Sequence, residues 1–411
     1  MTASPDIFAA DYAETPYWWR AAPPATDKAP LPAQVDIVVV GAGFTGLSAT
    51  LELARAGRSV LVIDAEAVGY GASSRNAGFV GKTLKHSLSE IVHALGKNSA
   101  VELYREAEAA YRLVFELVER EKIACHLNRG GRLIFSYSER QQASLVADLE
   151  LKKRLLNEPY ELLDRTGVAE ELQTPVFVAG ARIPDSATIH PGLYVRGLAS
   201  AAQRAGAIVA SHTMLTDVAG ERGAFRLTTS RGVVMARDVV IATNGYSSAG
   251  VPSWMRRRLV PFEGFILATE ELPKQTLDTI LPKDRSIVDG RVNLAFIRRA
   301  PDSRRIIIGA RAGMRHGNNL ENVAEAIWSD AVKLIPALSG FRVSHCWSGK
   351  CAGTFDLYPH LGVHDGIHYA VGYNFGGIAM GSYLGRLAAQ ILLGQDVTTP
   401  LRNRSFPTIP L

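Results

Sequence analysis

Cysteine is scarce in this sequence: 411 residues contain only Cys125, Cys346 and Cys351. Such a small and odd number argues against a disulfide framework and predicts a reducing compartment. Histidines such as His190 and His360 do not fall in the spacings that metal-ligand groups need, and we expect them to be structural. The sequence therefore predicts no metal site.

Long apolar runs and blocks of charge are also missing. No stretch of about 18 apolar residues is present, so no membrane-spanning helix is expected. The first residues contain Asp6 and Asp11 but no early Lys or Arg and no apolar signal-peptide core. The net charge is only +5, and the densest basic block is 256–258, which does not indicate a nucleic-acid partner. We expect a soluble cytoplasmic protein whose size predicts two domains.

The most informative stretch is 36–64. Its unbroken apolar run at 37–40 predicts a strand that is buried on both faces. A glycine-rich turn follows, then a helical pattern, then a second apolar run that ends in Asp64. Strand, turn, helix, strand and acid in this order predict a dinucleotide-binding βαβ unit.

Each glycine of the turn has a separate task in such a unit. Gly41 permits the tight turn, Gly43 lets the backbone approach a pyrophosphate, and Gly46 lets the helix pack closely on the strand. The pyrophosphate would lie at the helix N-terminus, and Asp64 would accept hydrogen bonds from a ribose hydroxyl. This stretch alone leaves open whether the dinucleotide is FAD or NAD.

A second glycine-rich segment follows at 69–78. Its small residues, two hydroxyls, Arg75 and Asn76 suit close contact with phosphates and with the polar atoms of a ring. A surface loop is the alternative interpretation. Earlier, the dense aromatic stretch Tyr17-Trp18-Trp19 lies in an otherwise irregular arm, and we expect it to anchor that arm on the body.

The remaining pattern divides the chain into a discontinuous α/β domain and an inserted α+β domain. We expect helices at 84–123, 145–156, 164–172, 191–205, 320–335 and 378–393. We expect strands at 207–210, 225–229, 233–236, 239–242, 262–269, 294–298, 305–309 and 369–371, and a hairpin at 125–137. The predicted units are an arm (1–32), a cofactor domain (33–83, 184–253, 344–400), a substrate domain (84–183, 254–343) and a tail (401–411).

Together these features resemble the FAD-dependent amine and amino-acid oxidases, the family of D-amino-acid oxidase, with γ-glutamylputrescine oxidase as the branch of greatest likeness. The resemblance rests on the Tyr17-Trp18 arm, the 41–49 fingerprint, the 71–76 loop, Trp347-Ser348-Gly349 and the glycine-rich start of the last helix. It implies a Rossmann-type FAD-binding domain and a second domain built on an antiparallel sheet. The implied cofactor is noncovalent FAD.

The resemblance also implies which residues contact FAD. Those around the pyrophosphate, ribose and adenine are Gly41, Gly43, Phe44, Thr45, Gly46, Asp64, Ala65 and Val218. Those along the flavin and its linker are Gly71, Ala72, Ser73, Arg75, Asn76, Ala77, Gly78, Thr243, Asn244, Gly245, Trp347 and Gly349. Those at the pyrimidine edge are Asn374, Phe375, Gly376, Gly377, Ile378 and Met380.

The activity that the resemblance implies is hydride removal from the carbon that bears an amine, giving an imine, with reoxidation by O2. The candidate substrate-side residues are Lys350, Trp347, Tyr246 and Tyr358, with Arg298 or Arg311 as a carboxylate clamp. In some relatives a cysteine attaches the flavin, and Cys351 is offset from that position.

Two rival functions stay open at this stage. One is a dehydrogenase that passes electrons to a quinone or carrier protein. The other is a flavin-binding protein with a structural or RNA-modifying role. The partners expected are a small amine or amino acid and O2 or another acceptor, with an oligomer possible.

Overall fold

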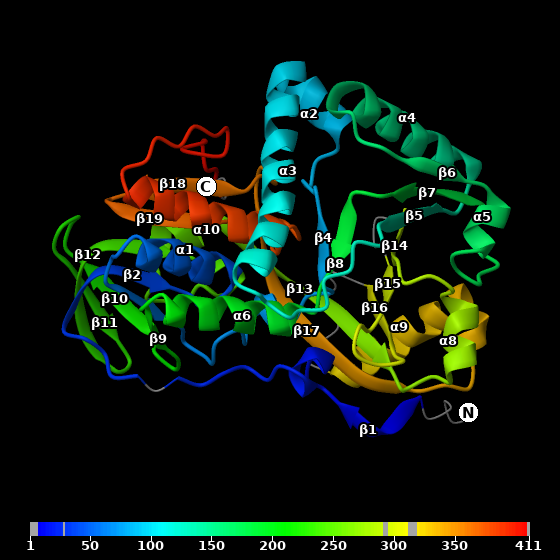
Figure 1. Ribbon diagram of the computed structural model, residues 1–411, viewed down its shortest axis with the longest axis horizontal. Helices are drawn as coiled ribbons and strands as arrows, with labels where there is room; N and C mark the ends of the chain where they lie inside the picture. Colours follow the sequence, from blue (N-terminus) through cyan, green and yellow to red (C-terminus); the bar gives the residue numbers. More distant parts are fainter. Residues whose placement is uncertain (1–6, 28, 291–294, 311–318, 409–411) are drawn as a thin grey trace.

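Five apolar strands form the parallel part of the first sheet in the computed structural model, which describes residues 7–27, 29–290, 295–310 and 319–408 (Figure 1). They are β2 (Gln34–Val40), β3 (Val60–Ile63), β9 (Ile208–Ala210), β12 (Gly232–Ile241) and β19 (Ile367–Val371). Their order is β9-β3-β2-β12-β19, and each pair of neighbours is parallel. Because the chain order reverses between β2 and β12, a ligand crevice is expected beyond the carboxyl ends of these two strands.

Both faces of this sheet are buried, as the apolar run at 37–40 predicted. Ile37 and Val39 pack with three helices, whereas Val38 and Val40 pack with the far side of the sheet. The three helices are α1 (Phe44–Arg55), α6 (Pro191–Arg204) and α10 (Ala379–Leu392). The sheet is extended by β10 (Leu215–Ala219), β11 (Phe225–Thr229) and β18 (His360–His364).

The sequence prediction of two separate strands at 233–236 and 239–242 is wrong, because β12 runs through both. Arg237 and Asp238 interrupt the apolar pattern, but the strand continues past them. Asp238 is fully buried and is neutralised by Arg222 and Arg237, with N–O distances of 2.9 and 2.7 Å. A buried carboxylate paired with two arginines thus occupies a strand position where the sequence pattern requires an apolar side chain.

The second sheet has nine strands in the described part of the chain and lies beside the first (Figure 1). In spatial order the strands are β1 (Phe8–Ala13), β17 (Val343–Thr354), β13 (Leu259–Thr269), β16 (Ile306–Ala310), β15 (Phe296–Arg299), β14 (Ser286–Asp289), β5 (Arg132–Ser136), β7 (Ala179–Ile183) and β6 (Glu161–Leu163). Neighbours are antiparallel except for β1–β17 and β14–β5. The predicted fold class is thereby confirmed.

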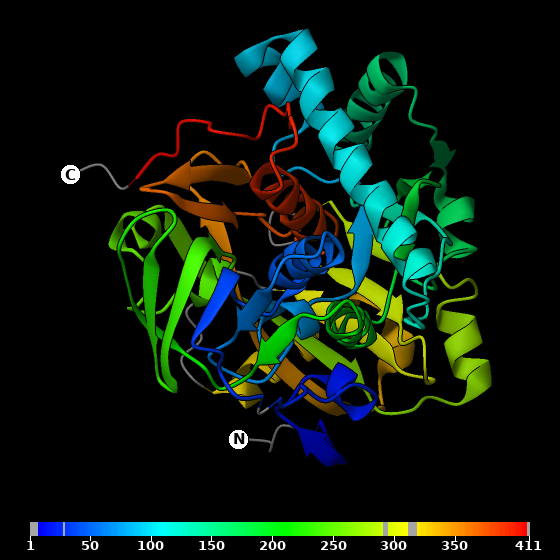
Figure 2. The ribbon, with the colours of Figure 1, turned by 60° about the vertical axis from the view of Figure 1, so that its left-hand side comes forward.

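Short elements complete the fold. Helices α5 (Arg165–Ala169), α8 (Lys274–Ile280) and α9 (Leu320–Leu334) bury apolar side chains against the second sheet. Helices α2 (Leu88–Leu95), α3 (Lys97–Arg120) and α4 (Glu139–Leu156) lie together, α2 and α3 share the apolar core of α1 and α10, and α3 is prominent in Figure 2. The remaining elements are α7 (Ser253–Arg256), the strand pair β4 (Phe79–Gly81) and β8 (Ser186–Thr188), and the 3-10 turns η1 (Tyr17–Arg20), η2 (Ala72–Ser74), η3 (Asn244–Tyr246) and η4 (Pro336–Leu338).

Two further sequence predictions are wrong. The arm is not irregular throughout, because β1 adds to the edge of the second sheet beside β17. The hairpin at 125–137 is absent from the described structure, because β5 pairs with β7 and β14 instead of with the residues just before it. In both cases the partner strand is distant in sequence, so local patterns could not reveal it. The strand predicted at 294–298 begins at a residue outside the described part of the chain.

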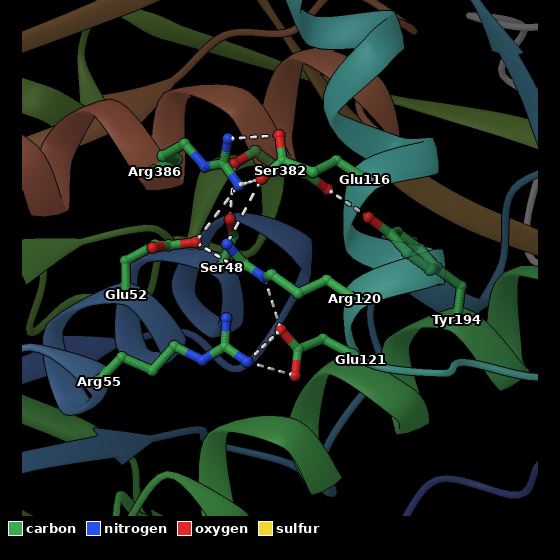
Figure 3. Close-up of polar contacts among 9 residues, drawn as sticks. All are labelled: Ser48, Glu52, Arg55, Glu116, Arg120, Glu121, Tyr194, Ser382 and Arg386. Carbon is green, nitrogen blue, oxygen red and sulfur yellow. Dashed lines mark hydrogen bonds and ion pairs between the residues drawn. The ribbon is translucent and has the colours of Figure 1, made fainter.

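An ion network joins α3 to α1 and α10 (Figure 3). The Arg386 guanidinium of α10 lies 2.6 Å from Glu116 of α3, and Arg120 of α3 lies 2.6 Å from Glu52 of α1. Arg386 also approaches Glu52, at 3.4 Å. The network is partly buried and shares its carboxylates, so it fixes helix positions better than isolated surface pairs do.

Within the described residues, no helix is both long enough and apolar enough to cross a membrane.

Glycines bring α10 into direct backbone contact with α1. An added Cβ on Gly385 would clash with the Thr45 carbonyl, and one on Gly381 would lie 3.0 Å from the Thr45 hydroxyl. Deeper in the same contact, the Ser48 hydroxyl donates to the Ser382 carbonyl at 2.7 Å (Figure 3). The absence of side chains at 381 and 385 therefore sets the spacing of the two helices.

We predict that Gly385→Ala destabilises the protein by about 2 kcal/mol, because the new methyl group overpacks the α1–α10 contact. Denaturant unfolding at constant pH measures this difference. Gly264→Ala is the matched control, since its added Cβ meets nothing within 4 Å. Equal stability of the two variants would contradict the packing argument.

Candidate cofactor and active site

The carboxyl ends of β2, β3, β12 and β19 bring four loops to one edge of the sheet, where the strand order leads us to expect the ligand crevice. Gly41 follows β2 with a φ of +105°, which strongly favours glycine, and an added Cβ would lie 2.9 Å from the Ala242 carbonyl oxygen at the end of β12. An added Cβ on Gly46 would clash with the Gly41 carbonyl. The tight turn and the close helix–strand packing expected from the sequence are therefore both present.

The N-terminus of α1 offers backbone N–H groups to this crevice. Gly43 is the N-cap residue, and the first intrahelical bond runs from the Leu47 N–H to the Gly43 carbonyl. The Phe44 N–H donates to the Ser73 hydroxyl at 3.0 Å. N–H groups in the first turn have no intrahelical acceptor, and the helix dipole adds positive charge there, so the site suits a pyrophosphate.

The Thr45 side chain turns away from the crevice, so only its backbone is available to a phosphate. Its buried hydroxyl donates to the Tyr373 hydroxyl at 2.7 Å, and Tyr373 donates to the Ala370 carbonyl at 2.6 Å. Tyr373 was not predicted as a site residue. Its position beside the Asn374–Gly377 segment was the available signal.

Asp64 organises the backbone at the end of β3. Its carboxylate accepts hydrogen bonds from the Ala42 N–H at 2.8 Å and the Glu66 N–H at 3.0 Å. Burial raises the pKa of this carboxyl group, although the two N–H donors oppose that shift. Ala65 follows it as an exposed residue. The carboxylate thus connects the glycine turn to the strand where a ribose would lie.

The predicted adenine contact, Val218, lies within β10, paired with Leu227 of β11. The segment that touches Asp64 comes earlier in the chain: the Thr213 N–H donates to the Asp64 carbonyl at 2.6 Å. The turn at 211–214 is therefore the part of this segment placed beside Asp64, and the sequence reasoning did not single it out.

The segment 71–78 forms a loop with its own internal hydrogen bonds. The Asn76 amide donates to the carbonyls of Ala72 and Ser73, and its oxygen accepts from the Gly78 N–H at 2.8 Å. An added Cβ on Gly78 would lie 2.5 Å from the Arg298 guanidinium. The loop therefore has a fixed conformation and packs against both sheets, which distinguishes it from an ordinary surface loop.

The start of α10 forms the opposite side of the crevice. Asn374 and Phe375 both have positive φ, 46° and 77°, which turns the chain sharply before the helix. The Asn374 oxygen accepts from the Thr354 N–H at 3.2 Å, and the Asn244 oxygen accepts from the Gly372 N–H at 2.9 Å. These contacts orient the N-terminus of α10 toward the crevice, where the helix dipole would stabilise negative charge. The residues at this end of the helix are Gly376, Gly377, Ile378 and Met380.

The second sheet contributes a strip without side chains. Gly264 of β13 lies opposite Gly349 of β17, and an added Cβ on Gly264 would meet nothing within 4 Å. An added Cβ on Gly349 would lie 3.0 Å from the Arg75 Cβ. The turn η3, which contains Gly245, packs against the same two strands. A flat ring system could approach the sheet closely at Gly264, whereas the Arg75 side chain covers Gly349.

Two of the predicted substrate-side residues, Lys350 and Tyr246, meet next to Gly349, and Trp347 lies two residues earlier on the same strand, against the 71–78 loop. The Lys350 N–H donates to the Tyr246 hydroxyl at 3.1 Å, and the Tyr246 ring lies against Gly71. Trp347 is fully buried, and its indole N–H donates to the Arg75 carbonyl at 3.0 Å. Burial raises the pKa of Tyr246, so its hydroxyl stays protonated at neutral pH.

The other two candidates have different surroundings. Arg298 is buried, and its guanidinium donates to the carbonyls of Ala77, Gly78 and Ile189, so it is occupied by backbone groups. Tyr358 packs against His86 and lies under the Arg404 guanidinium, and no described hydrogen bond joins it to Lys350 or Tyr246. Arg311 lies outside the described residues.

We predict that Asp64→Ala raises the dissociation constant of FAD at least tenfold. The variant loses the acceptor of two backbone N–H groups together with the carboxylate that would bind the ribose, and charge-assisted bonds are worth about 1.5–3 kcal/mol. Titration of apoprotein with FAD measures the change. Asp36→Ala is the control, because Asp36 also accepts a backbone N–H, that of Ser59, but at the start of β2. Unchanged affinity in Asp64→Ala would contradict the assignment.

Comparison with known proteins agrees with this geometry. A family model described as FAD dependent oxidoreductase (DAO) matches residues 36–391. The chain is 28% identical to gamma-glutamylputrescine oxidoreductase of Escherichia coli over 90% of this chain and 88% of that protein. It is 27% identical to glycine oxidase of Bacillus licheniformis, over 89% and 94% respectively. The crystal structure of glycine oxidase from Geobacillus kaustophilus superposes with a TM-score of 0.75 at 23% identity, covering 90% and 97%.

The residues present fit the dinucleotide. Two helix N-termini face one crevice, glycines at 41 and 46 allow the tight turn, and Asp64 lies at the end of the adjacent strand. These are the features that phosphates and a ribose require.

Proposed function

Because the chain belongs to the DAO family of FAD dependent oxidoreductases, and so is an FAD-binding enzyme, we propose that it oxidises the C–N bond of an amine or amino acid. Secondary amines, N-methyl amino acids and γ-glutamyl amines are the proposed substrate classes. Two relatives support this range through their names, one specifying gamma-glutamylputrescine and the other glycine.

The proposed reaction needs little from the protein beyond binding and orientation. Bound FAD supplies the two-electron acceptor. Hydride leaves the carbon that bears a neutral amine, the nitrogen lone pair forms the C=N bond, and the nitrogen proton passes to water. Hydrolysis of the imine then gives a carbonyl compound, together with ammonia from a primary amine or an amine from a secondary one.

The observation that carries the proposal is the open position at Gly264, beside the strand that contains Gly349 and Lys350. Substrate held there would lie near Tyr246 and near Glu263 and Lys350, which are cross-strand partners. Burial keeps Tyr246 protonated, and a hydride mechanism from a neutral amine requires no tyrosinate. Tyr246 would orient the substrate and exclude water, whereas the buried Trp347 would act only by holding the neighbouring loop.

We propose O2 as the acceptor that completes the cycle, with the positive charge of exposed Lys350 assisting its reduction. The alternative is a dehydrogenase that transfers electrons to a quinone or carrier protein. A non-catalytic or RNA-modifying flavin protein is a remoter alternative. Arg298 is not proposed as a carboxylate clamp, because its Nη1 and Nε groups already donate to backbone carbonyls.

The decisive experiment mixes FAD-loaded protein anaerobically with amines, N-methyl amino acids and γ-glutamyl amines. We expect at least one class to bleach the flavin absorbance, and air to restore it with release of hydrogen peroxide. Bleaching without peroxide would favour the dehydrogenase. Flavin that stays oxidised with every compound, while dithionite still reduces it, would contradict the proposed substrates.

We further propose that FAD is bound noncovalently, although Cys351 lies on the strand that contains Gly349. Burial raises the pKa of the Cys351 thiol to about 11, so little of the nucleophilic thiolate exists at neutral pH. Acid precipitation should therefore release all the flavin into the supernatant, from the native protein and from Cys351→Ser alike. Flavin retained in the native pellet but released from Cys351→Ser would show attachment at this residue.

A further inference from the structure

Three indole N–H groups converge on the loop that borders the cofactor site. Trp18 donates to the Asn76 carbonyl at 2.8 Å, and Trp347 donates to the Arg75 carbonyl at 3.0 Å. Trp19 donates to the Ser74 hydroxyl at 2.8 Å. Three consecutive loop residues are therefore each held by a different tryptophan, out of five in the chain.

The Arg75 side chain reinforces this attachment. Its guanidinium lies over the rings of both Trp19 and Tyr70, 4.6 Å from each centroid, and the two rings contact each other. It donates to the Tyr70 carbonyl at 2.8 Å and to the Ser348 carbonyl at 3.0 Å. Stacking on two rings and donation to two carbonyls hold this side chain in one place, so it holds the loop rather than reaching freely toward a ligand.

The arm that carries Trp18 and Trp19 is itself fastened to the second sheet. Strand β1 pairs with β17, the strand that carries Trp347. After β1, the Tyr17 hydroxyl contacts Asp302 at 2.9 Å and Ser303 at 2.7 Å in the turn between β15 and β16. Trp347 therefore belongs to the second sheet, and Trp18 and Trp19 belong to the arm that is attached to the edge of that sheet.

The other side of the same loop contacts the N-terminus of α1, where the pyrophosphate would lie. The Ser73 hydroxyl accepts the Phe44 N–H in the first turn of α1, and an added Cβ on Gly43 would lie 2.8 Å from that hydroxyl. A displacement of residues 74–76 would therefore move Ser73 relative to the helix N-terminus. The loop is the physical link between the second sheet and the cofactor.

We propose that Trp18, Trp19 and Trp347 are positioning residues, and that the N-terminal arm acts as a strap that sets the loop 73–76 against bound FAD. This inference rests on the proposed function only in that FAD occupies the crevice, and it does not depend on which substrate is oxidised. The arm fixes the position of the cofactor loop relative to the second sheet before substrate binds.

The test replaces Trp18 or Trp19 by Phe, which keeps an aromatic ring and removes the N–H donor. In apoprotein, hydrogen exchange of the Ser74, Arg75 and Gly78 amides, which bond within the loop, should accelerate about fivefold. The dissociation constant of FAD should rise by about the same factor, and the visible circular dichroism of the flavin should change. The expected factor corresponds to the loss of one hydrogen bond.

Trp328→Phe is the matched control, because Trp328 packs in α9 behind the second sheet and away from the loop. It should alter neither exchange in the loop nor the affinity for FAD. Urea unfolding of each apoprotein separates a local effect from a global one.

The proposal is overturned if both arm variants match the control in loop exchange and FAD affinity. It is equally overturned if loop exchange accelerates only in proportion to a loss of global stability, since that result would describe a general packing role. Failure of every amine to reduce wild-type flavin would defeat the proposed function instead, and it would leave the exchange and affinity results intact.

Discussion

The close approach of α1 and α10 is the constraint on which the site depends. Gly381 and Gly385 allow the two helices to touch through the Thr45 backbone, and the Thr45 hydroxyl bonds to Tyr373 just before α10. Both helix N-termini are consequently held at the carboxyl ends of the parallel strands. One can then face phosphates while the other faces developing negative charge at the far end of the same cofactor.

The second sheet reaches this assembly through the loop 73–76. Tryptophans from β17 and from the arm hold that loop by their N–H groups, and Ser73 connects it to the first turn of α1. Gly349 lies against the same loop, and Gly264, its partner on the neighbouring strand, leaves an open position. Cofactor and substrate can therefore meet at one junction, and hydride transfer depends on such alignment far more than on a dedicated acid or base.

Much of the fold was predictable wherever the partners are close in sequence. The βαβ unit at 36–64 and the helices α6, α9 and α10 follow from periodicity, with glycine after α1 and α6 and proline after α9. The helical stretch expected at 84–123 is instead divided into α2 and α3 at Gly96, which has a φ of +82°. Predictions failed where the partner is remote: β1 pairs with β17, and β5 pairs with β7 and β14. Strand β17, which begins where the sequence suggested a return to the cofactor domain, pairs instead within the second sheet.

By itself the sequence determined the dinucleotide fingerprint, because Gly41, Gly46 and Asp64 act through local backbone geometry that one short segment encodes. Only the tertiary structure decided what the scattered polar residues do. Arg298, a candidate clamp, is occupied by backbone carbonyls, whereas Trp18 and Trp19, expected only as anchors, hold the cofactor loop. A donor's role depends on which acceptor lies within about 3 Å of it, and for these residues the acceptors belong to segments far away in the chain.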